Sequence, residues 1–197
     1  MKGFLIGIGA VLGLGVILVL YYMGAYNGLV TKQEGVNNSW AQVQTQYQRR
    51  ADLVPQLVGT VKGVANFEKS TLTAVVEARA KVGSVQAGKD VVDNPEAFKK
   101  FEAAQGQLSS ALSHLMVVVE KYPELKATAN FSELQSQLEG TENRIAVARR
   151  DFNSSVQDYN VSIRRVPTSI IAGMSGFKEK AYFEAAGGSE KAPEVKF

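Results

Sequence analysis

An uninterrupted apolar segment near the start of the chain limits what the rest of it can be. Residues 4–22 (FLIGIGAVLGLGVILVLYY) contain no charged and no amide side chain. As an α-helix they would measure about 29 Å, close to the thickness of the hydrocarbon core of a bilayer. The residues that follow are polar enough for water. The sequence therefore predicts one transmembrane helix that attaches one soluble domain to a membrane surface.

A cleaved signal peptide is the alternative interpretation of this segment. Signal peptides have a shorter apolar region and a small-x-small cleavage site, and the best cleavage candidate here, after Ala25, has Met23 where a small residue is required. Tyr21, Tyr22 and Tyr26 follow the apolar run at the level of an interfacial aromatic belt. We therefore expect the segment to be a retained anchor.

Four glycines give the anchor two small-xxx-small pairs. Gly3 pairs with Gly7 and Gly9 with Gly13. Such pairs let two helix backbones approach closely in a membrane, although glycine is also common in membrane spans in general. The pattern favours a homo-oligomer that associates through the span.

The charges on either side of the span give its orientation. Lys2 precedes the span, whereas the next twenty residues carry only Lys32, offset by Glu34. By the positive-inside rule the N-terminus lies in the cytoplasm. We expect a single-pass membrane protein with its soluble domain outside the cytoplasm, on the periplasmic or extracellular side, and with the lipid bilayer as its first partner.

Composition argues against several classes of function. The 22 basic and 19 acidic residues nearly balance, which predicts no nucleic-acid partner. The chain has no cysteine and one histidine, His114, so we expect no metal site and no cofactor. The stretch from Gly83 to Asp90 matches GxxxxGK but lacks the Ser or Thr that a phosphate-binding loop needs for magnesium. We therefore predict that the protein is not an enzyme and has no catalytic residue.

The soluble part has the periodicity of an all-α fold. Apolar residues recur at steps of three and four, which indicates helices that bury one stripe each. The expected helices are 31–65, 67–82, one that begins at Asn94-Pro95 and stops at Pro123, and one of about 35 residues that carries the apolar stripe from Phe131 to Tyr159. Whether the first two are continuous stays open. Pro55 predicts a kink in the first, Asn94-Pro95-Glu96 predicts a helix start, and Pro123 and Pro167 predict stops.

Long helices joined by short turns favour an elongated antiparallel four-helix bundle, followed by a short C-terminal helical segment. The predicted parts are an anchor with a juxtamembrane turn (1–28), the helical bundle (29–167), a membrane-proximal amphipathic segment (168–186) and a disordered tail (187–197).

A charged stretch interrupts the regular first helix. The cluster singled out as a structural or inter-protomer site comprises Arg49, Arg50, Asp52, Arg79, Arg149 and Arg150. Its arginines can pair with carboxylates across protomers, or one of them can fill a slot of the apolar stripe and fix the register. Ordinary surface ion pairing is the alternative.

The C-terminal segment is a candidate for contact with the membrane surface. Apolar and basic residues recur there at helical spacing, and an even number of helices after the anchor returns the chain to the bilayer. The candidate residues are Ile170, Ile171, Met174, Phe177, Lys178, Lys180, Tyr182 and Phe183. A short helix packed on the end of the bundle is an equal alternative.

The motifs together carry a family resemblance. After the apolar span come YNGLV (26–30), RRADLVPQLV (49–58), EARAKV (77–82), ARRDFN (148–153) and GFKEKAYFE (176–184). In this order they resemble the LemA family of bacterial membrane-anchored proteins, from the anchor to about Glu184. The resemblance implies a helical bundle behind one transmembrane helix and a link to membrane shape and envelope organisation, with no established catalytic activity.

Two functions fit these observations. The first is a non-enzymatic scaffold that self-associates and organises or remodels the envelope membrane. The second is a monomeric or small-oligomer adaptor that presents a groove of the bundle to another envelope protein, such as a protease or a transporter.

Overall fold

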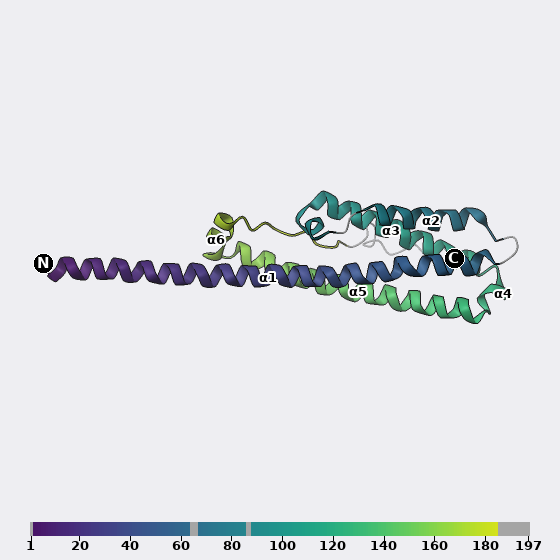
Figure 1. Cartoon of the computed structure of the whole chain (residues 1–197), viewed down its shortest axis with the longest axis horizontal. Coiled ribbons are helices and arrows are strands. Elements are labelled where there is room, and N and C mark those ends of the chain that lie inside the picture. Colours follow the sequence, from purple (N-terminus) through teal and green to yellow (C-terminus); the bar gives the residue numbers. More distant parts are fainter. Residues whose placement is uncertain (1, 64–66, 86–87, 185–197) are drawn as a thin grey trace, which may run out of the picture.

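A computed structural model describes residues 2–63, 67–85 and 88–184, and all regular secondary structure within these ranges is helical (Figure 1). The elements are α1 (Lys2–Lys62), α2 (Lys69–Ser84), the 3₁₀ helix η1 (Lys89–Asp93), α3 (Pro95–Val119), α4 (Pro123–Lys126), α5 (Ala129–Arg164) and α6 (Thr168–Ser175). The all-α prediction is confirmed. The predicted tail, 187–197, lies outside the described residues.

Helix α1 runs without a break from the apolar span into the soluble domain. Its 61 residues correspond to about 90 Å. The juxtamembrane turn expected before residue 29 is therefore wrong. Gly24 and Gly28 each weaken a helix by only about 1 kcal/mol, and no proline occurs before Pro55. Buried residues from Leu29 onward hold this part of α1 against the other helices.

Helices α1 and α2 are separate, which settles the question that the sequence left open. Helix α1 ends at Lys62 and α2 begins at Lys69, while residues 64–66 lie outside the described ranges. The expected bounds leave residues 83–93 as a loop between helices, and this is partly wrong, because α2 continues to Ser84 and residues 89–93 form η1.

The helix-start signals act as predicted. The Asn94 side chain accepts hydrogen bonds from the backbone N–H groups of Glu96 (3.0 Å) and Ala97 (3.2 Å), which caps α3. Helix α3 ends at Val119, four residues before Pro123, which begins the short helix α4. Helix α5 has 36 residues and ends before Pro167, as the sequence indicated.

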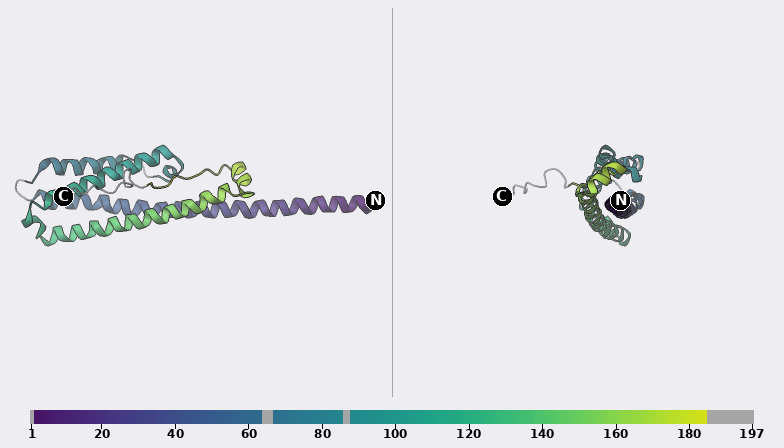
Figure 2. Two further views of the ribbon diagram at one scale, coloured as in Figure 1. Left: turned by 180° about the vertical axis from the view of Figure 1, so that it is seen from behind. Right: turned by 90° about the vertical axis from the view of Figure 1, so that its left-hand side faces the viewer.

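The four long helices lie along one common axis, and the views from two sides agree on this (Figures 1 and 2). Contacts between α1 and α5 join Ser39 to Ser155 (2.8 Å) and Arg50 to Glu142 (2.9 Å), so later residues of α1 meet earlier residues of α5. Helix α4 connects α3 to α5 at the end far from the span. Helix α6 lies at the other end, beside the point where α1 leaves the domain (Figure 1).

The core consists of two apolar clusters arranged along the helices. The cluster nearer the span is aromatic: Trp40 contacts the rings of Phe98, Phe101, Phe152 and Phe183 at centroid distances of 5.1–6.1 Å. The far cluster is mainly aliphatic and includes Leu57, Val61, Leu108 and Leu115. The aromatic cluster brings together side chains from α1, α3, α5 and the C-terminal segment.

The C-terminal segment is helical over only part of its predicted length. Helix α6 has eight residues and ends at Ser175, and the next residue, Gly176, has a left-handed φ of 76°, as in a glycine C-cap. Residues 177–184 contain no helix. The helical spacing expected for the C-terminal segment is therefore wrong beyond α6, because the chain turns at Gly176 and then lies along α5, with its backbone bonded to side chains of α5.

Candidate functional site

The centre of the domain contains a buried arginine between the two apolar clusters. Arg50 is 1% exposed and reaches across to α3 and α5. Its Nη1 donates to the Ser109 hydroxyl (2.6 Å) and to Glu142 Oε1 (2.9 Å), and its Nη2 donates to Gln105 Oε1 (2.5 Å) and to the Gln105 carbonyl (3.1 Å). Three helices are thus joined by one side chain.

This polar layer occupies the same height on each helix. On α1 it lies between Tyr47 of the aromatic cluster and Leu53 of the aliphatic cluster, and on α3 Gln105 lies between Phe101 and Leu108. The predicted slot of the apolar stripe is therefore filled by Arg50. The partners Gln105, Ser109 and Glu142 were not predicted as partners. The sequence did contain a signal for these partners: Gln105 on α3 and Glu142 on α5 are polar residues that lie between apolar core positions, at the same height as Arg50.

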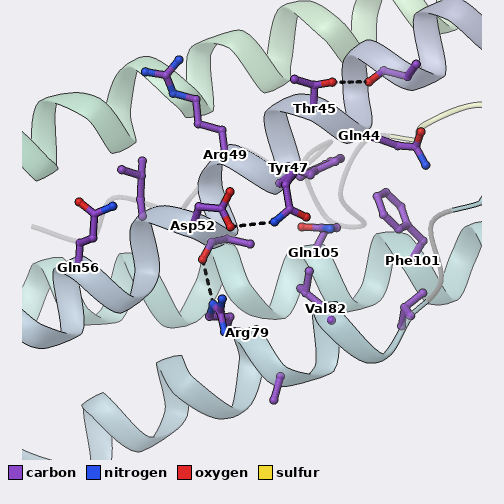
Figure 3. Close-up of a pocket in the computed structure, with 17 residues that line it drawn as sticks. Gln44, Thr45, Tyr47, Arg49, Asp52, Gln56, Arg79, Val82, Phe101 and Gln105 are labelled. Carbon is purple, nitrogen blue, oxygen red and sulfur yellow. Dashed lines mark hydrogen bonds between the residues drawn. The ribbon is translucent and has the colours of Figure 1, made fainter.

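A second arginine compensates for the proline in α1. Pro55 has no N–H, so the carbonyl of Ala51, four residues earlier, does not receive the helical hydrogen bond that residue 55 would otherwise donate. Arg79 of α2 donates from Nε to this carbonyl at 2.9 Å (Figure 3). The motifs that contain Pro55 and Arg79 are thereby brought into direct contact.

A groove runs along α1 beside this contact, with a volume of about 1150 Å³. Gln44, Tyr47, Arg49 and Asp52 of α1 line it together with residues of α2 and α3, including Val82, Phe101 and Gln105 (Figure 3). Asp52 accepts a hydrogen bond from Gln48 (2.8 Å) and is exposed, as is Arg49. These two residues of the predicted cluster therefore lie on the surface.

The other two arginines of the predicted cluster also have different positions. Arg149 lies 3.6 Å from Glu102 and stacks at 4.4 Å over the Phe183 ring, whereas Arg150 is exposed beside Asp151 (3.8 Å). The cluster is thus dispersed: Arg50 and Arg79 make interhelical contacts in the domain, and Arg149 fixes the C-terminal segment.

Three titratable groups near these contacts have altered pKa values. Burial raises the pKa of Tyr47, and the nearby Arg149 and Arg50 oppose this rise. Burial also raises the pKa of the Glu102 carboxyl, again opposed by Arg149. Burial and the negative charge of Asp93 raise the pKa of Tyr159 to about 12. In each case the first cause is packing in the core.

Two asparagines of α5 bind the backbone of the C-terminal segment. Asn153 donates to the Phe183 carbonyl and accepts from its N–H, both at 2.9 Å. Asn160 does the same with Lys180, at 2.9 and 3.0 Å. We call residues 177–184, held in this way, the strap. Sequence reasoning missed this role, although two asparagines seven residues apart on one helix share a face.

The strap buries part of the residue set predicted for the membrane surface. Phe183 lies in the aromatic cluster, and the buried Lys180 forms an ion pair with Asp93. Ile171 of α6 is also buried, and Phe177 is half-buried against Tyr26. The prediction that Ile171, Lys180 and Phe183 contact the membrane surface is therefore wrong, because all three side chains are buried in the domain. The exposed members of the set are Ile170, Met174, Lys178 and Tyr182.

The anchor makes up the first third of α1 and projects beyond the domain (Figure 1). Among the described residues α1 is the one helix long and apolar enough to cross a membrane, and none of its apolar window is buried. A Cβ added at Gly3, Gly7, Gly9 or Gly13 would meet nothing within 4 Å. The glycine pairs therefore lie on free surface of the helix.

The soluble domain contains polar contacts between its helices and a groove along α1. In residues 2–63, 67–85 and 88–184 no group of three His, Cys, Asp or Glu side chains is placed to hold a metal ion. The polar contacts join helices to one another and attach the strap. These features define a helical, membrane-associated protein with one candidate span.

Comparison with known proteins identifies the family: residues 39–197 match the LemA family model, and the chain belongs to that family. It is 30% identical over 176 residues to magnetosome protein MamQ of Magnetospirillum gryphiswaldense, covering 80% of this chain and 64% of MamQ. It is 24% identical over 170 residues to protein LemA of Metamycoplasma hominis, covering 86% of this chain and 74% of that protein. The chain thus spans about 64% of the length of its MamQ relatives.

Proposed function

We propose that the protein is a non-enzymatic scaffold that self-associates in the bacterial envelope membrane and organises or remodels it. The observation that carries this proposal is the unbroken helix α1, which is both the span and a central helix of the domain core. A helix without a flexible joint transmits the angle of the span to the domain. Association of spans would therefore set the relative positions of the domains above the bilayer.

The glycine pairs support association with more than one neighbour. At about 100° per residue, the Gly3/Gly7 pair and the Gly9/Gly13 pair lie about 120° apart around the helix axis. Each pair offers a place where another helix backbone can approach closely. Two different faces allow one chain to contact two neighbours, which a scaffold needs and a simple dimer does not.

The domain provides the rigid body of this scaffold. We infer an antiparallel four-helix bundle of α1, α2, α3 and α5, supported by the pairing of later α1 residues with earlier α5 residues. The Arg50 layer joins α1, α3 and α5 at one height, and a polar layer of this kind favours one register over others.

The proposed location is the inner (cytoplasmic) membrane, with a single pass and the domain on the periplasmic or extracellular side. Lys2 on one side of the span and the near-neutral stretch on the other support this orientation.

The test is the particle mass of the full-length protein in lipid nanodiscs and in detergent, measured over a range of concentrations. We expect oligomers. Gly7→Leu and Gly13→Leu should each reduce the size by blocking one face, and the double variant should be monomeric. Gly15→Leu is the matched control, since Gly15 lies on a third face of the same helix. A wild-type protein that stays monomeric at every concentration contradicts the proposal.

The groove beside Arg79 supports a second candidate function, an adaptor for another envelope protein such as a protease or a transporter. It is open, and it exposes both charged side chains (Arg49, Asp52) and uncharged ones (Gln44, Gln56) of α1. Affinity purification from native membranes separates the two candidates. A foreign protein recovered in stoichiometric amount with a monomeric chain favours the adaptor, whereas recovery of the chain with copies of itself favours the scaffold.

A further inference from the structure

Helix α6 lies at the height where the transmembrane span ends. Tyr22, the last residue of the apolar run, forms a hydrogen bond through its hydroxyl with the Ser175 hydroxyl at 3.3 Å, although the two residues are 153 positions apart. One turn further along α1, the Tyr26 ring contacts the Phe177 ring edge-on at a centroid distance of 5.7 Å. The C-terminal end of α6 is therefore attached to the first turns of α1 that follow the span.

One side of this region is packed on the domain, and the other side is apolar and exposed. Ile171 and Ala172 are buried and hold α6 in place. Ile170 and Met174, one helical turn apart, are 62% and 77% exposed, and Val166 in the preceding turn is 81% exposed. We call these three side chains the α6 patch.

We propose that the α6 patch inserts into the interfacial region of the same bilayer that α1 crosses, so that the protein contacts the membrane at two points. This inference rests on the membrane attachment of α1 in the proposed function but not on self-association. The occupant follows from position: a bilayer crossed by residues 4–22 has its surface at Tyr22, and Tyr22 bonds to the last residue of α6. Interfacial segments carry an apolar side flanked by basic residues.

Charge near the patch fits a lipid surface. Arg165 precedes Val166, and Lys178 follows α6 by three residues, and both are exposed. Cationic side chains at this height attract anionic headgroups and let the apolar side chains reach the boundary of the acyl chains. A free apolar patch elsewhere would lack this position: Val117, for example, is 65% exposed on α3, in the half of that helix packed in the far cluster.

Contact at two points has a mechanical consequence. A single span leaves the domain free to rotate about the helix axis and to tilt within the membrane. With the α6 patch inserted, α1 must lean towards the side on which α6 is attached, so that this side of the domain rests on the bilayer surface. The span and the domain would then have one defined tilt, which makes the contacts between neighbouring copies reproducible.

The absence of cysteine from the sequence allows a direct test on the full-length protein. Single nitroxide labels are introduced at Met174→Cys, at Val117→Cys as the exposed apolar control, and at Val11→Cys within the span. The proteins are reconstituted in vesicles of phosphatidylethanolamine and phosphatidylglycerol. Relaxation by oxygen, which concentrates in lipid, is compared with relaxation by a water-soluble nickel chelate.

We expect the ratio of oxygen to nickel relaxation at position 174 to exceed that at 117 several-fold and to approach the value at 11. A ratio at 174 equal to that at 117 overturns the proposal, because the label is then in water. Low accessibility to both reagents also overturns it, because a protein neighbour then covers the patch. The fluorescence of the buried Trp40 shows whether each labelled protein is folded.

A second experiment changes the patch itself and reads the result from a label at another position. Ile170→Asp combined with Met174→Asp should increase the nickel accessibility of a label at Val166→Cys, the third position of the α6 patch, whereas Val117→Asp should not change it. Unchanged accessibility in the double variant contradicts insertion. The particle mass of the same samples reports on self-association separately, so failure of this inference and failure of the scaffold are distinguishable.

Discussion

Arg79 of α2 donates a hydrogen bond to the Ala51 carbonyl of α1, the one carbonyl that Pro55 leaves without its helical donor. A proline inside a helix normally costs stability, partly because this acceptor loses its partner. Here a neighbouring helix supplies the donor. The proline thus creates a contact site for α2, and the two helices are attached at a fixed height.

The contact predicts a specific coupling between Arg79 and Pro55. Arg79→Ala should lower the free energy of unfolding by about 1–2 kcal/mol, because the Ala51 carbonyl loses its donor. In a Pro55→Ala background residue 55 regains its N–H and can satisfy Ala51, so the same arginine change should cost less. The measurement is a double-mutant cycle by chemical denaturation of the full-length protein in detergent. Equal costs in both backgrounds contradict this explanation.

The Arg50 layer predicts that substitution of Arg50 lowers the stability of the protein much more than substitution of its neighbour Arg49. Arg50→Ala should destabilise the protein by about 3–5 kcal/mol, since Gln105 and Glu142 lose a buried charged partner. Glu142→Gln should cost less, because Glu142 is 41% exposed and water can replace part of the contact. Thermal unfolding followed by circular dichroism gives the order of the variants.

Arg49→Ala is the matched control, because Arg49 is exposed on the same turn and should change stability by less than about 0.5 kcal/mol. If Arg50→Ala does not fold, Arg50→Met retains most of the side-chain volume and measures the loss of the polar contacts alone. A stability for Arg50→Ala equal to that for Arg49→Ala would contradict the role of the layer.

Local signals gave the helices of the soluble domain, because each such signal acts within a few residues. The cap at Asn94, the proline at position 95 and the stop before Pro167 are all of this kind. The predicted juxtamembrane turn is wrong because a change from apolar to polar residues does not by itself end a helix, and the backbone of α1 continues through it.

Long-range contacts were not predictable in the same way. Arg50 stood out as polar within an apolar stripe, but its partners are 55 to 92 residues away and depend on the relative height of three helices. The strap was not predictable from periodicity, because periodicity indicates regular helices and strands. The strap has neither, and its backbone is bound by the side chains of Asn153 and Asn160.

The strap predicts local changes in amide hydrogen exchange. The N–H groups of Lys180 and Phe183 donate to Asn160 and Asn153, respectively, and should be protected in the wild-type protein. Asn160→Ala should speed exchange most at Lys180, and Asn153→Ala most at Phe183, while the core of α1 stays protected. Asn143→Ala, an exposed asparagine of the same helix, is the control. Uniform loss of protection over the whole domain would argue against a separately attached strap.

The buried Tyr159 hydroxyl predicts loss of stability at alkaline pH. Its pKa is raised to about 12 from about 10, mainly by burial and further by Asp93. The folded state therefore holds the proton more tightly than the unfolded state. The resulting contribution is complete below pH 10 and is lost as the pH rises towards 12, when both states ionise. A shift of this size corresponds to about 3 kcal/mol, and the raised pKa of Tyr47 acts in the same direction.

Denaturation at a series of pH values between about 9 and 12 measures this loss, with tyrosinate absorbance of the native protein as an independent titration. Tyr159→Phe removes the ionisable group, so its stability should fall less steeply with pH, although the Tyr47 contribution persists. Since Tyr159 contacts the strap through Lys180, whose Nζ lies 5.8 Å from the ring centroid, the protection factor of the Lys180 N–H should also fall as Tyr159 ionises. A Tyr159→Phe protein with the full wild-type slope would place the alkaline transition in another group.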